Sequence, residues 1–184
     1  MKTDQYLEHH GVKGQKWGVK NGPPYPINNA RNRAIKRVRK TAKTKKDVDR
    51  VVSTLNQKQR NFLGLNPEDN EYLTIEQGEY VTKRFLAKYG NETIGFFDIL
   101  DETPNAKKGN LNLATAIDSN YQGKGYGAKL AKKGTDWIKK NRDKFDTVTW
   151  TAKQDNAASR YLAEKNGWKY NKKKSNKEWA VYNI

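Results

Sequence analysis

Alternation of apolar and polar residues predicts secondary structure over most of the chain beyond its first quarter. Apolar residues recur at helical spacing over 48–55, with Asp47 in the position of an N-cap. Two strand-like runs follow within 80–100, on either side of a turn at Gly90, and this arrangement indicates a hairpin. Residues 110–118 again alternate apolar and polar side chains and predict a third strand.

The second half of the chain changes period twice. Apolar positions at a spacing of about 3.6 residues predict a helix over about 126–141. The β-branched and aromatic run at 147–153 predicts a strand, and Asn156 can cap a following helix that ends at 166–167. Residues 168–184 predict two short strands around a lysine-rich turn. This order of elements predicts a mixed α/β (α+β) sheet with helices on its faces.

Residues 1–46 follow neither period and predict an N-terminal extension to a single domain at 47–184. The net charge of the 184-residue chain is +17, and residues 1–60 hold 16 Lys and Arg against 4 Asp and Glu. The extension contains a proline linker at 21–26 and a basic segment at 31–46 with nine Lys and Arg and no acid. We expect the extension to be extended or partly helical.

Composition excludes several classes of site. Without cysteine the chain has no disulfide framework, no thiolate metal site and no cysteine nucleophile. The histidines are the neighbours His9 and His10, so we predict no metal site. No stretch is apolar enough for a membrane span or a secretory signal, which predicts a soluble protein without membrane partners, in the cytoplasm of its host.

Three glycines alternate in the segment NYQGKGYGAKL at 120–130, between the predicted third strand and the following helix. A strand, a glycine-rich loop and a helix N-terminus together direct unpaired backbone N–H groups at an anion, typically a phosphate. The segment lacks the GxxxxGK[ST] pattern of a Walker loop and the GxGxxG pattern of a dinucleotide fold. The alternative is an ordinary tight turn that allows close helix packing.

The run from Gln122 to Gly127 fits a third pattern, Q/R-x-x-G-x-G/A, and here the chain resembles the GCN5-related N-acetyltransferase (GNAT) family. LNLATAID is similar to the fourth strand of that family, and NAASRYLAEKNGWKY is similar to its second signature. The resemblance covers about 47–184 and implies a GNAT-like acyl-CoA N-acyltransferase fold with acetyl-CoA as co-substrate. The residues that match the second signature are Asn156, Ser159, Leu162, Glu164, Lys165, Gly167 and Trp168.

The resemblance also implies where acetyl-CoA binds. The fourth and fifth strands of the family splay apart, and the pantetheine arm lies in the gap, where an N–H near 114–116 would polarise the thioester carbonyl. The glycine loop would hold the pyrophosphate, and Asn156 would lie near the pantetheine or cap its helix. The cofactor-binding residues implied are Thr115, Ala116, Ile117, Gln122, Gly123, Lys124, Gly125, Tyr126, Gly127, Ala128 and Asn156.

The catalytic residues cannot be named from the sequence. Many family members protonate the leaving thiolate with a tyrosine where this chain has Ala163, and Tyr161 is about 200° away around the helix. Asp98, Glu102 and Asp118 are candidate bases at predicted strand ends, and each also fits a surface carboxylate.

The N-terminal segment EHHGVKGQKWGVK resembles a short element, H-H-G-x-x-G-x-x-W-G, of bacteriophage head and head-maturation proteins. It predicts a phage-encoded protein that docks on a capsid or other virion protein through residues 5–20. The charge of residues 31–46 favours nonspecific nucleic-acid contact, or equally a solvated helix.

Two functions follow from these patterns. The first is an N-acetyltransferase that moves an acetyl group from acetyl-CoA to an unidentified primary amine. The alternative is a structural or packaged phage protein, associated with the virion, that uses a GNAT-like fold for binding without turnover. The motifs favour the first, and Ala163 favours the second.

Overall fold

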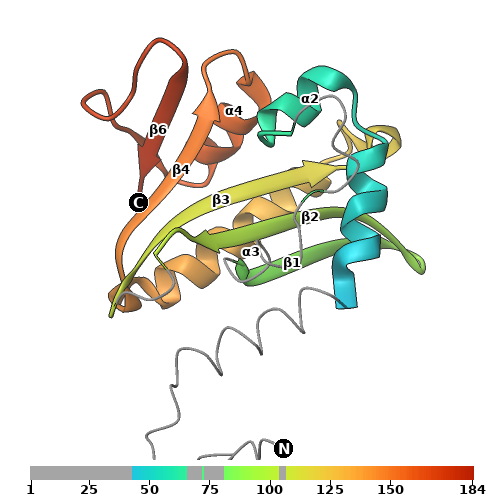
Figure 1. The fold of residues 1–184 in the computed structure, drawn as a ribbon, viewed down its shortest axis with the longest axis horizontal. Helices are drawn as coiled ribbons and strands as arrows, with labels where there is room; N and C mark the ends of the chain where they lie inside the picture. The colour runs from blue at the N-terminus through green and yellow to red at the C-terminus, as the bar shows by residue number, and fades with distance from the viewer. Residues whose placement is uncertain (1–42, 66–71, 73–80, 104–106) are drawn as a thin grey trace, which may run out of the picture.

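The computed structural model describes residues 43–65, 72, 81–103 and 107–184, which form one layered α/β unit. Its centre is a six-stranded sheet in the order β1-β2-β3-β4-β6-β5 (Figure 1). Neighbouring strands are antiparallel except β3 and β4, which are parallel, so the predicted mixed sheet is confirmed. The strands are β1 (Val81–Tyr89), β2 (Glu92–Asp101), β3 (Gly109–Ile117), β4 (Phe145–Lys153), β5 (Lys169–Tyr170) and β6 (Trp179–Asn183).

The helices lie on both faces of this sheet (Figure 1). A helix over 43–53 crosses one face, and α3 (Tyr126–Lys140) packs on the other, against β1, β2 and β3 (Figure 1). The predicted N-cap at Asp47 is wrong, because the helix already includes residues 43–46. The remaining helices are α2 (Gln57–Phe62) and α4 (Ala157–Lys165), with 3-10 turns η2 (Ser119–Tyr121) and η3 (Arg142–Lys144).

Each face of the sheet buries its own apolar core. Because successive side chains of a strand point to opposite faces, Leu111 and Leu113 of β3 pack on the α3 side with Phe97. Phe96, the neighbour of Phe97, packs on the other side under Val52 of the helix over 43–53. The alternation predicted for residues 110–118 is therefore what positions β3 between two helices.

Strands β3 and β4 pair only over their first few residues. The register joins Gly109 to Phe145, Asn110 to Thr147 and Leu111 to Val148, and no later pair is formed. From Thr149 onward β4 pairs with β6 instead, while β3 continues along β2 to Ile117. The two parallel strands therefore diverge and leave one edge of β3 open.

Helix α2 was not predicted from the sequence, although it has a local signal. Asn56 accepts a hydrogen bond from the Gln59 amide at 3.0 Å, and the Gln59 side chain accepts from the Asn56 amide at 3.1 Å. This reciprocal capping box satisfies two donors at the helix start. In the fold, α2 lies beside the opening between β3 and β4 (Figure 1).

Candidate active site

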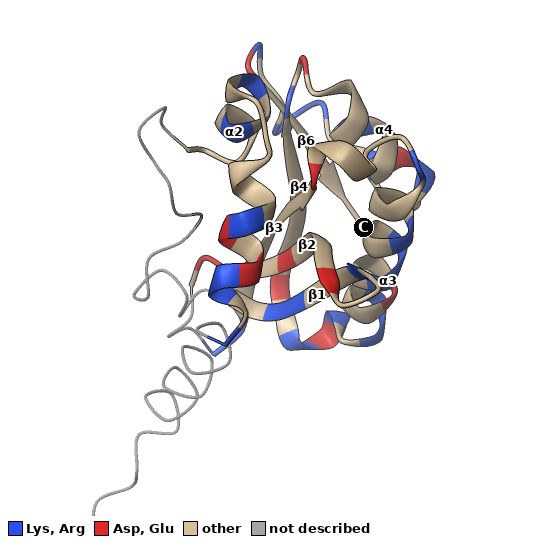
Figure 2. Ribbon diagram, turned by 90° about the vertical axis from the view of Figure 1, so that its right-hand side faces the viewer, with Lys and Arg blue, Asp and Glu red and all other residues tan. Residues whose placement is uncertain are grey.

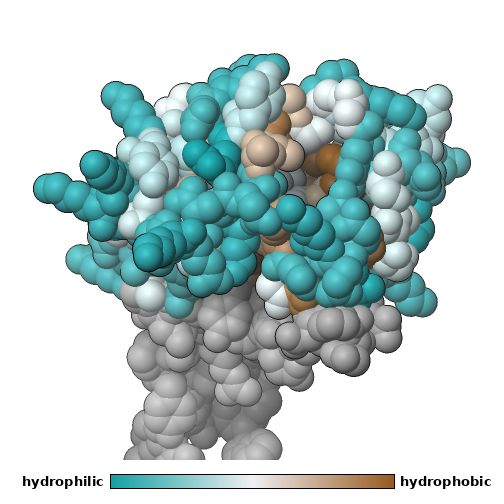
Figure 3. All heavy atoms as spheres, turned by 90° about the horizontal axis from the view of Figure 1, so that it is seen from above, coloured by the Kyte–Doolittle hydropathy of each residue, from teal (hydrophilic) through white to brown (hydrophobic). Residues whose placement is uncertain are grey.

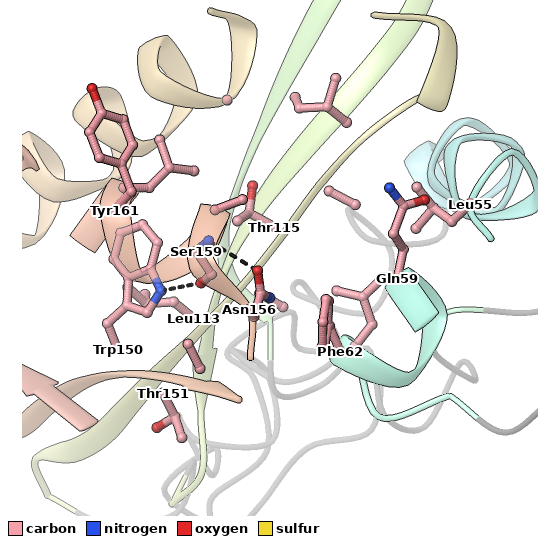
Figure 4. A pocket seen from close by; sticks show the side chains of 18 of the residues that line it. Leu55, Gln59, Phe62, Leu113, Thr115, Trp150, Thr151, Asn156, Ser159 and Tyr161 are labelled. Carbon is pink, nitrogen blue, oxygen red and sulfur yellow. Dashed lines mark hydrogen bonds between the residues drawn. The ribbon is translucent and has the colours of Figure 1, made fainter. Parts of the chain in front are cut away.

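A cleft of about 1560 Å³ opens where β3 and β4 separate. Its floor includes the second half of β3, and its two sides come from α2 and from β4 with α4. Figure 4 shows Gln59 and Phe62 on one side of this cleft and Asn156 on the other. Seen from above, apolar side chains gather in a hollow surrounded by hydrophilic ones (Figure 3).

The open edge of β3 presents backbone groups to this cleft. The Asp118 amide donates to Ile94 O of β2 at 2.9 Å, and backbone N–H groups alternate between the two edges of a strand. The amides of Thr115 and Ile117 therefore face the gap, whereas those of 114 and 116 face β2. An extended ligand in the gap can bond to β3 as a further strand would.

The N-terminus of α3 provides a second set of unpaired amides. Gly125 is the N-cap with φ of 81°, and Gly123 has φ of 73°, a left-handed conformation that favours glycine. A Cβ atom at either position would meet no atom within 4 Å, so the loop is open to a ligand. Because the first N–H groups of a helix have no intrahelical acceptor, this loop can bind an anion.

The structure brings ten of the eleven predicted cofactor-binding residues to the cleft. Three line it from β3, six come from the loop and first turn of α3, and Asn156 comes from the start of α4. The exception is Lys124, which lies in a neighbouring hollow of about 630 Å³ and donates to Asn120 O at 3.0 Å. Lys124 therefore points away from the cleft that holds the other ten.

Two of these residues also have structural roles. Asn156 accepts from the Ser159 amide at 3.1 Å and caps α4, as the sequence predicted. Gln122 donates to Ile117 O at 2.8 Å and so ties the glycine loop to the end of β3. Both bonds hold the ends of the cleft in place.

The cleft includes residues that the sequence did not single out. Leu55, Gln59 and Phe62 line it from the α2 side. Gln59 also donates to the Gln122 side chain at 2.8 Å and so connects α2 to the glycine loop. The capping box at Asn56 is the local signal that indicates a helix start here, whereas only the tertiary packing places that helix next to the glycine loop.

Ser159 has a defined orientation in the cleft. The indole Nε1 of buried Trp150 donates to Ser159 Oγ at 2.9 Å (Figure 4). Because a hydroxyl carries one proton and accepts through its lone pairs, the Ser159 proton is free to point elsewhere. Ser159 lines the cleft and is placed to donate a hydrogen bond into it.

The helix α4 turns Ala163 and Tyr161 in different directions, as the spacing predicts. Ala163 is fully buried in the core and does not line the cleft. Tyr161 is 58% exposed, lines the rim and accepts from Lys165 Nζ at 3.1 Å. The position at which the family often carries its tyrosine acid therefore contributes no functional group here.

The three carboxylates considered as bases do not line the cleft. Asp98 is fully buried between β1 and the helix over 43–53, where Arg84 Nε and Nη2 donate to it at 2.7 and 2.6 Å. Burial raises the pKa of the Asp98 carboxyl, and the bonds from Arg84 offset part of this rise. Asp118 accepts from the Asn120 amide and from Arg50, and Glu102 accepts from Asn112 at 3.1 Å.

Charged side chains lie both around the cleft and within it. On the helix over 43–53, Lys and Arg stand beside Asp (Figure 2), and Lys45 pairs with Asp49 at 2.7 Å. In the cleft itself the charged side chains among the described residues are Lys165 and Lys174. Burial raises the pKa of the Tyr72 phenol, which lines the cleft, well above its usual value.

Comparison with known proteins agrees with this geometry. The model of the acetyltransferase (GNAT) family matches residues 36–168. The chain belongs to this family. Acetyl-CoA is the co-substrate of GNAT proteins. The diverging strands and the glycine loop of this GNAT chain are thus parts of an acyl-CoA N-acyltransferase fold.

Two solved structures share this fold. A Streptococcus mutans protein, smu.2055, aligns with a TM-score of 0.57 at 18% identity, and a GNAT acetyltransferase from Streptococcus pneumoniae aligns with 0.52 at 17%. Each alignment covers 76% of this chain and 93% of the other. A Bacillus anthracis protein described as a streptothricin acetyltransferase, solved with acetyl coenzyme A, aligns at 0.43 and 22% identity over 61% of this chain and 68% of its own.

This chain spans 55–64% of the length of several further chains that it matches. No curated protein matches the sequence. The phage-like element at 5–20, with both histidines, lies outside the described residues. Of the basic segment at 31–46, the structure describes residues 43–46. Within the described part, no helix is long and apolar enough to cross a membrane, and no three acidic or histidine side chains group as metal ligands.

Proposed function

We propose that this chain is an N-acetyltransferase that transfers an acetyl group from acetyl-CoA to a primary amine. The observation that carries the proposal is the open edge of β3 beside the N-terminus of α3, because the two together offer backbone donors along one continuous cleft. The amides at 123–128 would hold the pyrophosphate, and the backbone of Thr115 and Ile117 would pair with the pantetheine arm.

The reaction needs little from side chains. A neutral amine attacks the thioester carbonyl carbon, a C–N bond forms, the C–S bond breaks, and sulfur leaves with the bonding electron pair. The nitrogen loses one proton and sulfur gains one, which leaves an N-acetylated amine and a free thiol. The Thr115 amide faces the gap and can donate to the developing oxyanion, and Ser159 can donate to the leaving thiolate.

The test of the site is CoA binding by a Gly125→Val variant, measured by isothermal titration calorimetry. Valine at φ of 81° is strained and adds bulk where the phosphates would lie, so we expect affinity to fall at least about 100-fold, since several charge-assisted bonds are lost. Gly90→Val is the matched control, because Gly90 also has positive φ but lies in the β1–β2 turn away from the cleft. Equal affinity of Gly125→Val and wild type would refute this site.

A second function, binding without turnover in a phage particle, is favoured by Ala163, which is buried and supplies no acid. Release of free thiol from acetyl-CoA with a panel of amines separates the two. Turnover that Gly125→Val abolishes supports the enzyme, and CoA binding without thiol release supports the second function. We also propose that the protein is encoded by a phage, that it docks through residues 5–20, and that it is found in the host cytoplasm or the virion. Mass spectrometry of purified virions tests these proposals.

A further inference from the structure

The hairpin between β5 and β6 forms a basic rim on one side of the cleft. Residues 171–178 read NKKKSNKE and hold four lysines, all exposed, and Lys174 lines the cleft. The acid of this segment, Glu178, is paired with Lys153 at the end of the neighbouring strand β4. Within the part of the chain that the structure describes, the hairpin lysines Lys172, Lys173, Lys174 and Lys177 have no salt-bridge partner.

Hydrogen bonds between side chains and the backbone preorganise this turn. The Lys174 amide donates to both Asn171 O and Asn171 Oδ1, at 3.2 and 3.1 Å. Ser175 Oγ donates to Asn171 O at 2.8 Å and accepts from the Val181 amide at 2.9 Å. Asn176 Oδ1 accepts from the amides of 178 and 179. The lysines therefore project from a structured turn, so a partner orders less backbone when it binds them.

The opposite side of the cleft mouth is apolar. Phe62, Leu63 and Leu65 line it from α2 and the residues after it. A molecule that enters between α2 and the hairpin therefore meets apolar side chains on one side and ammonium groups on the other. The charge complementary to the hairpin is negative, and repulsion from Lys174 disfavours a polycationic amine at this mouth.

The lysines also extend beyond the cleft. Only Lys174 of the four lines it, so the basic rim continues outward along the turn. A small anion would contact one or two of these charges, whereas an extended acidic chain would contact several. A peptide supplies both an aliphatic amine for acetylation and apolar side chains for the α2 wall. The bases of a nucleic acid can stack on an aromatic side chain but carry no aliphatic amine.

We propose that the acceptor amine belongs to an acidic peptide segment, with its carboxylates on the hairpin lysines and an apolar side chain against Phe62 and Leu63. This inference rests on the proposed acetyltransferase function. The amine can be the N-terminal amine or a lysine side chain of such a segment, since both are aliphatic amines on the same backbone.

Binding is tested first, without any need for turnover. Fluorescence anisotropy on the CoA-loaded protein compares a labelled peptide rich in Asp and Leu with its twin in which every Asp is Asn. We expect the acidic peptide to bind about tenfold or more tightly at low ionic strength, with the difference shrinking as salt rises because exposed charges are screened. Lys172→Ala/Lys173→Ala/Lys174→Ala should remove the preference, and Lys133→Ala, an exposed lysine on α3, should keep it.

Equal affinity for the two peptides, or a preference that survives the triple substitution, would overturn the proposal. A single-stranded RNA of the same charge is the competitor. If the RNA binds more tightly than the acidic peptide and depends on the same lysines, the partner is a nucleic acid and the peptide proposal is wrong.

Turnover then separates this inference from the one on which it rests. One peptide arm has a free N-terminus and no lysine, and the other has a blocked N-terminus and one lysine. Each arm is tested as an acidic peptide and as its twin in which every Asp is Asn. The proposal is supported if the acidic peptide of an arm releases thiol faster because its KM is lower, and if the triple substitution raises that KM about tenfold. The arm that reacts identifies the amine. If neutral amines are acetylated and acidic peptides are not preferred, only this inference fails, whereas absent CoA binding would reject the acetyltransferase itself.

Discussion

At the residue scale, the contact between Trp150 and Ser159 connects the core to the cleft. Trp150 is 2% exposed and packs edge-on against both Phe97 and Trp168, with ring centroids 5.7 and 5.6 Å apart. Its indole N–H has one acceptor, Ser159 Oγ. A buried donor without an acceptor is costly, so the stability of the core and the orientation of the Ser159 hydroxyl depend on the same bond.

Ser159→Ala should therefore lower the free energy of unfolding by about 1–3 kcal/mol, because it leaves the Trp150 N–H buried and unpaired. Urea denaturation measures the loss. In a Trp150→Phe background, which has no N–H to satisfy, the same substitution should cost less than about 0.5 kcal/mol. An equal loss in both backgrounds would mean that the bond contributes nothing to stability.

At the scale of elements, the packing of α3 on the sheet requires a glycine. Gly134 lies on the buried side of α3, and a Cβ atom there would stand 2.6 Å from Phe97 Cδ1 of β2. Gly127, one residue inside the same helix, is different, since its Cβ would lie 3.6 Å from both Ile117 and Leu162. The close approach of α3 to β2 keeps the glycine loop in place at the end of β3.

We expect Gly134→Ala to lower the free energy of unfolding by about 1–3 kcal/mol, because overpacking against Phe97 outweighs the gain in helix propensity. Gly127→Ala is the matched substitution and should be neutral or raise stability by up to about 1 kcal/mol. Guanidinium unfolding of both variants measures the two effects. A stabilised Gly134→Ala variant would show that the helix can move away from the sheet at little cost.

At the scale of the whole molecule, α2 spans the mouth of the cleft. Lys58 pairs with Asp155, just before α4, at 3.0 Å, and Gln59 bonds Gln122 of the glycine loop at 2.8 Å. Both contacts are exposed, and such contacts contribute about 0–1 kcal/mol each. They are thus suited to hold a cover that opens when a ligand enters or leaves.

Lys58→Ala/Gln59→Ala should raise the dissociation rate of CoA several-fold, because α2 then opens more readily. The free energy of unfolding should fall by less than about 1 kcal/mol, as expected for exposed contacts. Stopped-flow displacement of CoA measures the rate. Lys132→Ala, which removes an exposed pair with Asp136 on α3, is the control and should leave the rate unchanged. An unchanged rate in the double variant would mean that α2 does not cover the ligand.

Much of the fold could be predicted, because its elements have local signals. The helix over Tyr126–Lys140, the strands around Gly90 and the capped helix after Asn156 lie within a few residues of their predicted bounds. Helix α2 was missed, although Asn56 and Gln59 carry a capping box, because the six-residue helix is too short for an apolar period.

The sequence by itself determined the alternation of elements, the left-handed glycines of the loop and the helix cap at Asn156, because each depends on residues close together in the chain. Only the tertiary structure decided that Asp98 lies in an ion pair with Arg84, that Lys124 points away from the cleft and that α2 faces the glycine loop. Those outcomes depend on which distant segments pack together, and burial and charge pairing arise only after that packing.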